Sequence, residues 1–292
     1  MKDQPPDFDA LWDYNDPAET ERKFRELLPA AENSTNCGYL PELLTQIART
    51  QGLQRKFEDG HATLDRVEAG LKPDMARPRI RYLLERGRVF NSSKLPDKAR
   101  PLFLEAFELG KTAGEDALAV DAAHMMAIVE PPDKQIEWNL RAMKLAEESE
   151  EPRARKWLGS LYNNLGWTYH DLKQYDKALD LFRRGVRFRD EHKQAKELRI
   201  ARWCVARCLR SLDRIGEALE MQNSLLKEHD QAKTTDGYVH EELAECLLLL
   251  HREAEAQPHF AKAYAELSTD SWLAENEADR LTRLKQLGEA RS

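Results

Sequence analysis

The chain has 292 residues, of which 41% are hydrophobic and 33% are charged. This composition is typical of a folded protein, and the length allows two ordinary domains or one extended array. Apolar runs are too short to cross a membrane, and the first residues lack the apolar stretch of a secretory signal. The net charge of −7 gives no global reason to expect nucleic acid as a partner. Four scattered cysteines are too few for a disulfide framework, so we expect a cytoplasmic protein.

At the N-terminal end, we expect a flexible tail over residues 1–15, followed by a capping helix within residues 16–40. Asp16 can cap this helix, a proline occupies the first helical position, and Glu19 occupies the third. The helix is predicted over about residues 17–31. Three aromatic residues of the tail could dock on the rest of the chain: Phe8, Trp12 and Tyr14.

Between residues 41 and 268, six segments share one pattern. A small residue in a first helix is followed twelve positions later by a second position, and Gly or Ala fills eleven of these twelve sites. Side chains no larger than methyl let two antiparallel helices approach closely, and a residue four positions further on fills the gap beside the contact. The pairs are Ala48 with Gly60, Gly87 with Ala99, Ala123 with Gln135, Gly166 with Ala178, Ala206 with Ala218, and Ala244 with Ala256. The pattern predicts six helical hairpins that start near residues 41, 80, 116, 159, 199 and 237.

This pattern, clearest from Leu161 to Gly185, resembles the tetratricopeptide repeat, and the resemblance covers about three quarters of the chain. It implies an all-α fold, a right-handed α-solenoid of about six repeats with capping helices at both ends. The C-terminal cap is expected over residues 269–292, with a leucine-striped helix over about 271–287. The fold hosts many unrelated roles, so function has to be argued from the residues that line it.

In proteins of this family the first helix of each repeat lines a concave groove. The stripe predicted to face the groove combines arginines, amides and aromatic rings, which suits a peptide with acidic and apolar side chains. The predicted groove residues are Arg88, Asn91, His124, Asn163, Asn164, Trp167, His170, Trp203, Arg207, Arg210 and Tyr238. In a second interpretation, the tryptophans pack between repeats and the arginines pair with nearby carboxylates.

Two further segments carry hypotheses of their own. Residues 183–189 are rich in arginine on a predicted second helix, and they form either a surface for an acidic or phosphate-rich partner or a solvated helix face. Residues 147–155 are acidic and contain a proline within the longest spacing between repeats, which predicts a hinge between the third and fourth repeats.

Enzymatic chemistry is not expected. Gly110, Lys111 and Thr112 resemble the end of a phosphate loop, but Glu105 stands where that loop needs a glycine. A zinc-protease helix that starts at His240 would need a second histidine where the chain has Ala244. No metal ligand set or cofactor motif is evident, so the sequence predicts a non-enzymatic interaction module or scaffold. A peptide-responsive regulatory receptor and a self-assembling scaffold remain as alternatives.

Overall fold

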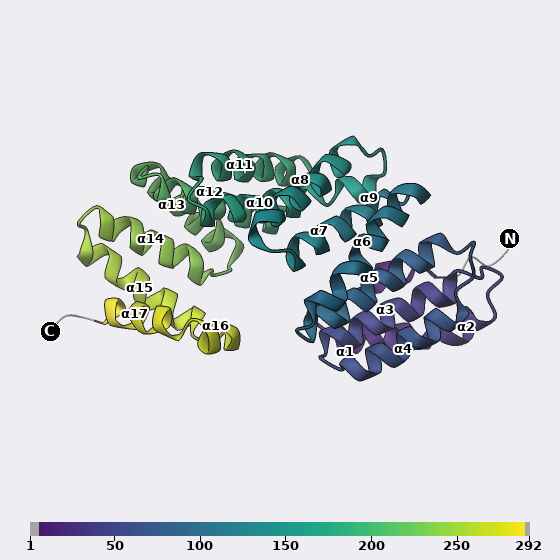
Figure 1. Cartoon of the computed structure of the whole chain (residues 1–292). Coiled ribbons are helices and arrows are strands. Elements are labelled where there is room, and N and C mark those ends of the chain that lie inside the picture. The colour runs from purple at the N-terminus through teal and green to yellow at the C-terminus, as the bar shows by residue number, and fades with distance from the viewer. Residues whose placement is uncertain (1–5, 290–292) are drawn as a thin grey trace. The chain divides into compact units, whose positions relative to one another are not determined.

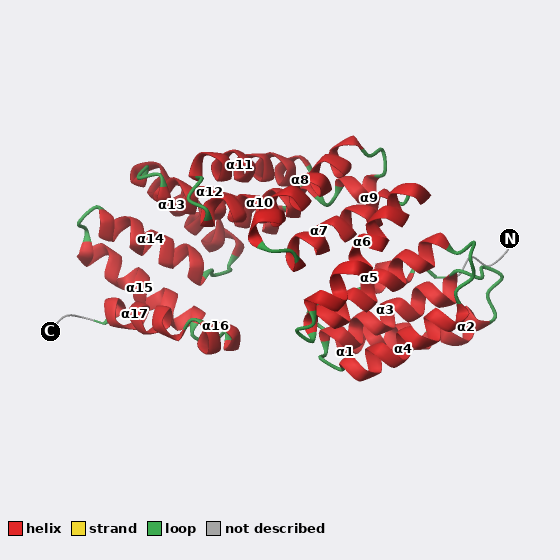
Figure 2. Cartoon of the chain, viewed as in Figure 1, coloured by secondary structure: helices red, strands yellow, loops and turns green. Residues whose placement is uncertain are grey.

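The computed structural model describes residues 6–289, except for the side chains of residues 132 and 133. Within this range the secondary structure is helical, with no strand (Figures 1 and 2). The chain forms two compact units, residues 1–161 (unit 1) and residues 162–292 (unit 2). The predicted all-α repeat solenoid is confirmed. Among the described residues, no helix is both long enough and apolar enough to span a membrane.

Unit 1 holds three helical hairpins and an N-terminal cap, in which neighbouring helices pack in chain order (Figure 1). Its elements are the 3-10 helix η1 (Phe8–Leu11), α1 (Pro17–Glu26), α2 (Leu28–Glu32), α3 (Tyr39–Leu53), α4 (Phe57–Gly70), α5 (Ala76–Ser92), α6 (Pro96–Ala113), α7 (Asp116–Val129), α8 (Pro132–Glu148) and α9 (Pro152–Arg155). The first helices of the three hairpins, α3, α5 and α7, form what we call the first-helix face of unit 1.

Helix α10 (Leu158–Asp171) crosses the boundary between the units and opens the fourth hairpin. The later elements are α11 (Tyr175–Glu191), α12 (Ala195–Ser211), α13 (Ile215–Ala232), α14 (Gly237–Leu249), α15 (Glu253–Leu267), α16 (Ser271–Asn276) and α17 (Ala278–Gly288). Helices α10, α12 and α14 provide the first-helix face of unit 2. The first helices begin at residues 39, 76, 116, 158, 195 and 237, which is up to four residues before the predicted starts.

The paired small residues lie where the two helices of a hairpin touch. A methyl group on Gly166 would lie 2.5 Å from the Phe182 ring, and one on Gly87 would lie 2.4 Å from the Phe103 ring. Carbon atoms do not approach this closely, so only hydrogen fits at either glycine. The alanines at the equivalent first-helix positions are fully buried: Ala48, Ala123, Ala206 and Ala244. The periodic pattern in the sequence is therefore the interhelical contact itself.

Two of the six gap-filling positions hold amides in place of apolar side chains. Asn139 donates a 3.0 Å hydrogen bond to the carbonyl of Gln135, and its Oδ1 atom has no hydrogen-bond partner within the described part of the chain. Gln222 has no exposed surface, and neither of its amide atoms has a hydrogen-bond partner among the described residues. A buried polar group without a partner costs free energy, so Gln222 weakens the hairpin of α12 and α13.

Five of the six hairpins close through the same tight turn. A residue with a left-handed backbone conformation follows each first helix, and the next amide bonds back to a carbonyl of that helix, as when Leu95 donates to Phe90 at 2.9 Å. The left-handed residues are Arg55, Lys94, Lys173, Asp213 and His251. This turn ends a helix without glycine, at a modest backbone cost.

Both terminal helices are interrupted, although one continuous helix is predicted at each end. Asp16 caps α1 through the Glu19 amide as predicted, but the helix stops at Glu26. Pro29 cannot donate a backbone hydrogen bond, and its ring collides with the carbonyl four residues earlier. At the other end Leu273 and Leu281 join the same core cluster. An unbroken helix would turn residues eight positions apart by about 80° from one another, so the break between α16 and α17 lets both leucines reach the core.

Residues 6–15 do not extend away from the body of unit 1, in contrast to the predicted flexible tail; residues 1–5 lie outside the described range. Phe8 is 6% exposed and packs against Phe24 and Tyr39, with ring centroids 6.3 and 5.4 Å away. Phe8 thus occupies an apolar site between α1 and α3, and Trp12 and Tyr14 lie in the same docked segment.

The segment over residues 147–155 is attached to the start of α7. The Ser149 hydroxyl contacts the Asp116 carboxylate at 2.6 Å, and the Glu151 carboxylate accepts a 2.9 Å hydrogen bond from the Ala117 amide. All of these groups belong to unit 1. The hinge between the third and fourth repeats stays a prediction.

Candidate functional site

A row of aromatic rings runs along the first-helix face of unit 2. Trp167 on α10, Trp203 on α12 and Tyr238 on α14 are partly exposed, with successive ring centroids 5.9 and 5.8 Å apart. Trp203 also donates a 3.1 Å hydrogen bond from Nε1 to the Tyr238 carbonyl. The predicted aromatic residues of this unit are therefore brought together, and they pack between repeats while keeping part of their surface exposed.

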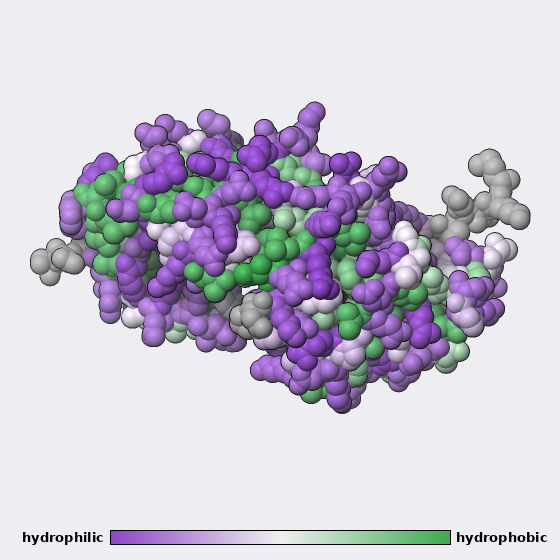
Figure 3. All heavy atoms as spheres, turned by 45° about the horizontal axis from the view of Figure 1, so that its top comes forward, coloured by the Kyte–Doolittle hydropathy of each residue, from purple (hydrophilic) through white to green (hydrophobic). Residues whose placement is uncertain are grey.

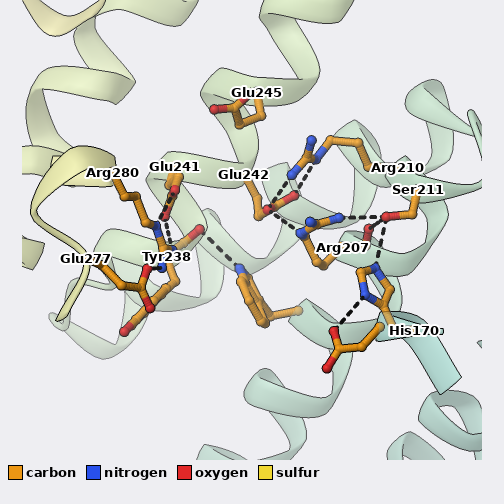
Figure 4. A network of polar contacts seen from close by, with 12 residues as sticks. His170, Arg207, Arg210, Ser211, Tyr238, Glu241, Glu242, Glu245, Glu277 and Arg280 are labelled. Carbon is orange, nitrogen blue, oxygen red and sulfur yellow. Dashed lines mark hydrogen bonds and ion pairs between the residues drawn. The ribbon is translucent and has the colours of Figure 1, made fainter. Parts of the chain in front are cut away.

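Two predicted arginines lie beside this row and share one buried carboxylate. Glu242 of α14 accepts from Arg210 at 2.7 and 2.9 Å, and its Oε1 atom lies 3.0 Å from Nε of Arg207 (Figure 4). Arg207 also donates to the Ser211 hydroxyl at 2.7 Å. The carboxylate is 5% exposed, whereas the Arg207 side chain is 27% exposed. One negative charge thus holds two positive charges, and Nη2 of Arg207 has no hydrogen-bond partner among the described residues.

His170 completes the polar network at its α10 end. Its Nε2 atom lies 2.9 Å from the Ser211 hydroxyl (Figure 4), and the residue is 8% exposed. Burial lowers the pKa of His170, and the nearby Arg207 guanidinium lowers it further. A neutral imidazole at pH 7 follows, which suits a positioning role better than an ion pair.

The two predicted asparagines are adjacent on α10. The Oδ1 atom of Asn163 lies 3.4 Å from the Cys204 sulfur, and its Nδ2 atom lies 3.5 Å from Oδ1 of Asn164. Both side chains are partly exposed, and Asn163 lies on the side of α10 that meets α12. Asn163 is therefore partly engaged within the protein, and Asn164 retains hydrogen-bonding capacity.

The remaining predicted residues belong to unit 1. Arg88 bridges Glu85 on its own helix, at 2.6 Å, and Asp121 on α7. Burial alone would lower the pKa of Arg88, but these two carboxylates raise it above its ordinary value. His124 lies 5.5 Å from the Trp157 ring, and burial lowers its pKa. The partly exposed Asn91 sits in the last turn of α5, where its carbonyl accepts from the Lys94 amide. Arg88 of α5 thus faces α7, His124 of α7 faces Trp157, and Asn91 lies at one end of the face.

Carboxylates are paired with the arginines of this face in unit 2. In unit 2, Arg280 pairs with Glu241 at 2.5 Å, and Arg283 pairs with Glu245, in addition to the pairs at Glu242 (Figure 4 draws all of these carboxylates). The carboxylates come from α14 and neutralise arginines of α12 and α17. The second interpretation of the arginines, pairing with nearby carboxylates, describes this arrangement.

Unit 1 contains a cavity of about 330 Å³ that the sequence did not indicate. Its wall combines the docked N-terminal segment with arginines and carboxylates from α3, α5, α7, α9 and the residues just before α7 and α9. The arginines are Arg49, Arg77, Arg81 and Arg153, and the segment contributes Asp9, Trp12 and Tyr14. Arg49 and Arg81 lie on α3 and α5, which are first helices of the kind predicted to line the groove, so their position in the repeats was a signal that could have identified them.

The arginine-rich surface over residues 183–189 borders a groove of about 540 Å³ between α11 and α13. Arg183 and Arg187 are exposed on one wall, whereas Glu217 and Glu220 are exposed on the other. The groove therefore carries both signs of charge. Charged and polar residues also cover much of the face drawn in Figure 3, with hydrophobic residues in patches between them.

Metal or thiol chemistry has little support in the described residues. No group of three His, Cys, Asp or Glu side chains among them is arranged to hold a metal ion. Burial raises the pKa of the Cys204 and Cys246 thiols to about 12 and that of Cys208 to about 11. These thiols are protonated at pH 7 and behave as small apolar side chains.

Comparison with known proteins agrees with this architecture. Residues 158–191, which are helices α10 and α11, match the family model described as tetratricopeptide repeat. A search of curated proteins finds no match.

Solved structures show the same fold at low sequence identity. A signal transduction ATPase with a tetratricopeptide repeat sensor from Pyrococcus horikoshii matches with a TM-score of 0.72 and 15% identity, over 91% of this chain and 42% of that one. The chain therefore spans less than half of that ATPase. The apo form of RapI matches at a TM-score of 0.70 and 12% identity, over 90% and 76% of the two chains. BtubC from P. vanneervenii matches at 0.60 and 12%, over 79% and 94%.

Proposed function

Because the chain is a tetratricopeptide repeat protein, and its repeats form a scaffold for protein interactions, we propose that it acts without catalysis by holding a partner segment on the first-helix face of unit 2. The proposed partner is a protein segment with acidic and apolar side chains, and the proposed compartment is the cytoplasm. The binding residues in this proposal are Asn163, Asn164, Trp167, His170, Trp203, Arg207, Arg210 and Tyr238, with Arg88, Asn91 and His124 on the corresponding face of unit 1.

The observation that supports this proposal is the aromatic row. Trp167, Trp203 and Tyr238 lie on three successive first helices and keep part of their ring surface exposed. Rigid aromatic side chains supply apolar contact area at a low cost in conformational entropy. A partner chain that follows the row would meet one ring per repeat.

The acidic preference is assigned to the arginine pair. Glu242 compensates one of the two positive charges that it holds, and Nη2 of Arg207 is not engaged with a described residue. A partner carboxylate can use this donor without breaking the internal pairs. Charge-assisted hydrogen bonds of this kind are stronger than neutral ones, so the contact would orient the partner.

The experiment is affinity capture from the source lysate, followed by titration calorimetry of the captured segment. Wild type is compared with Arg207→Glu, which places a carboxylate beside Glu242 and would repel an acidic partner. Arg214→Glu is the matched control, because Arg214 pairs with Glu217 at the start of a second helix. We expect Arg207→Glu to weaken binding by at least about tenfold, which corresponds to 1.4 kcal/mol, while Arg214→Glu leaves binding unchanged. Equal affinity of all three proteins would exclude this face.

A self-assembling scaffold is the second candidate, and one residue favours it. Trp272 on α16 is 59% exposed, which is unusual for so large an apolar side chain. Sedimentation of wild type and Trp272→Ala over a range of concentrations tests it, because self-association through this ring would disappear in the variant. A receptor role has only fold-level support, from the sensor repeats of the Pyrococcus horikoshii protein.

A further inference from the structure

Residues 7–14, which we call the cis segment, carry the chemistry of a ligand. The segment combines three acidic side chains with Phe8, Trp12 and Tyr14, and it lies against α1, α3, α5 and α9 of unit 1. Its only regular structure is the four-residue helix η1. The segment thus touches several helices of the repeat array without joining any of them.

An acidic side chain of this segment is held by two arginines from different helices. The Asp9 carboxylate accepts a 2.8 Å hydrogen bond from Arg81 of α5, and it lies 3.4 Å from Nη1 of Arg153 of α9. The Arg81 side chain is 10% exposed, so this contact is shielded from water. The Glu42 carboxylate lies 3.0 Å from Nε of Arg81. Burial alone would lower the pKa of Arg81, but the Asp9 and Glu42 carboxylates raise it above its ordinary value. Arg81 is therefore a charged anchor for a carboxylate at this position.

Two aromatic side chains flank the acid. Phe8 packs against Phe24 and Tyr39, and the Arg81 guanidinium carbon lies 5.5 Å from the centre of its ring. Trp12 donates from Nε1 to the Gln46 carbonyl oxygen at 3.1 Å. These contacts recognise an aromatic residue, an acidic residue directly after it, and a tryptophan three positions after the acid.

The same surface extends past the cis segment. The Arg49 guanidinium lies 5.9 and 5.6 Å from the rings of Trp12 and Tyr14, and Tyr14 itself is 59% exposed. The cavity of about 330 Å³ lies between the segment and α7, and Trp157 contributes to its wall. The face therefore has room for more side chains than the cis segment supplies.

The attachment of the cis segment is shallow. Phe8 is its one buried residue, and the other residues are exposed or partly exposed. Besides the side-chain contacts described above, the Tyr39 hydroxyl donates a 2.7 Å hydrogen bond to the Pro6 carbonyl, and hydrogen bonds join the Asp13 backbone to the Thr20 hydroxyl. A segment with so few buried contacts opens at a small fraction of the free energy of global unfolding.

We propose that the first-helix face of unit 1 is a binding site for a short peptide with an aromatic–acid–x–x–tryptophan pattern, and that residues 7–14 occupy it in cis until such a peptide displaces them. Arg81 and Arg153 bind the acid, the site between Phe24 and Tyr39 receives the aromatic ring, and Gln46 accepts from the tryptophan. The proposed function also places Arg88, Asn91 and His124 on this face of unit 1, but the groups that bind the cis segment are different residues. The test below changes none of the residues of the proposed function, so either proposal can fail without the other.

The probe is a fluorescein-labelled peptide with the sequence of residues 6–16, followed by fluorescence anisotropy on the full chain. Wild type is compared with Phe8→Ala/Asp9→Ala/Trp12→Ala, in which the cis segment loses its anchors while Asp16 and Thr20 still hold α1. A cis ligand that is docked nine-tenths of the time raises the apparent Kd about tenfold, so we expect the triple variant to bind the probe at least tenfold more tightly. Circular dichroism verifies that both proteins keep the same helical content.

Three controls locate the site. In the triple variant, Arg153→Glu should weaken binding, whereas Arg141→Glu should not, because Arg141 pairs with Glu137 on the exposed side of α8. A probe with Asp9→Arg should bind the triple variant at least tenfold less well than the original probe. In wild type, saturating probe should speed hydrogen exchange at the Asp13 amide, which is bonded to Thr20.

Each opposite result overturns part of the proposal. A folded triple variant that does not bind the probe removes the site. Equal affinity of wild type and triple variant shows that residues 7–14 do not compete for it. Equal affinity of the original probe and the Asp9→Arg probe shows that Arg81 and Arg153 do not recognise the acidic residue.

Discussion

The close approach of α10 and α11 at Gly166 can be tested by adding a single methyl group. In Gly166→Ala the new carbon would lie 2.5, 2.7 and 3.0 Å from three atoms of the Phe182 ring. The ring is 2% exposed and also packs against Trp167, with centroids 5.2 Å apart, so it has little space into which to move. The helices must therefore separate, or the ring must leave its preferred rotamer.

The expected size of the effect follows from two opposing contributions. Overpacking of a well-packed core costs about 1–3 kcal/mol. Alanine is favoured over glycine inside a helix by up to about 1 kcal/mol. We therefore expect Gly166→Ala to lower the free energy of unfolding by up to about 2 kcal/mol. A glycine-to-alanine change without overpacking is measured separately in Gly216→Ala, in the first turn of α13, where an added methyl group meets no atom within 4 Å and should be neutral or stabilising.

The assay is urea denaturation followed by far-ultraviolet circular dichroism, with wild type and both variants measured together. Phe182→Leu in the Gly166→Ala background should recover part of the loss, because the smaller side chain leaves room for the methyl group. The coupling energy of this double-mutant cycle reports the contact directly. A Gly166→Ala protein as stable as Gly216→Ala would refute the argument, since the ring would then not be confined.

Three further outcomes follow from buried polar groups. Gln222→Leu should raise the free energy of unfolding by about 1–2 kcal/mol in the same assay, because it removes two unpartnered amide atoms from the core. Burial and the neighbouring His259, 2.9 Å away between Nδ1 atoms, lower the pKa of His240 to about 4. In the unfolded chain His240 has its ordinary pKa of about 6.5, so the unfolded state binds a proton at a higher pH than the folded state does. The free energy of unfolding should therefore decrease as the pH falls from 6.5 toward 4, by about 2 kcal/mol near pH 5. The variant His240→Leu should flatten a plot of the urea midpoint against pH. Glu242→Ala should cost about 2–3 kcal/mol in thermal or urea unfolding because two guanidinium groups lose their shared carboxylate, and it should exceed the cost of Glu245→Ala, whose partner is an exposed arginine.

Periodicity in the sequence was sufficient to predict the packing of the repeats. A hairpin contact needs a small residue on each helix at a fixed separation, so one local rule covers Gly87, Gly166 and the four alanines that share their role. Helix ends were less accessible. The break after α1 is caused by Pro29, and the effect of a proline on a helix can be predicted from the local sequence. The break before α17 depends on which leucines reach the core, and this is decided by tertiary packing.

The predicted groove residues were harder to interpret because their partners lie one repeat away. Arg210 and Glu242 are 32 positions apart, and Arg88 and Asp121 are 33 positions apart. A search for opposite charges at this separation would have indicated that the arginines are paired. Composition of a single helix cannot show this, because the carboxylate comes from the next first helix.

The sequence indicated that the aromatic residues of the cis segment could dock, but it did not indicate where. Periodicity assigns structure to residues that repeat, and residues 7–14 repeat nothing, so they were expected to form a tail. Yet the partner predicted from the first-helix stripe has acidic and apolar side chains, and Phe8, Asp9 and Trp12 supply that chemistry within the same chain. A ligand predicted from a binding surface can thus be sought first among the chain's own non-repeating segments, because a short tether gives such a segment a high effective concentration at the site.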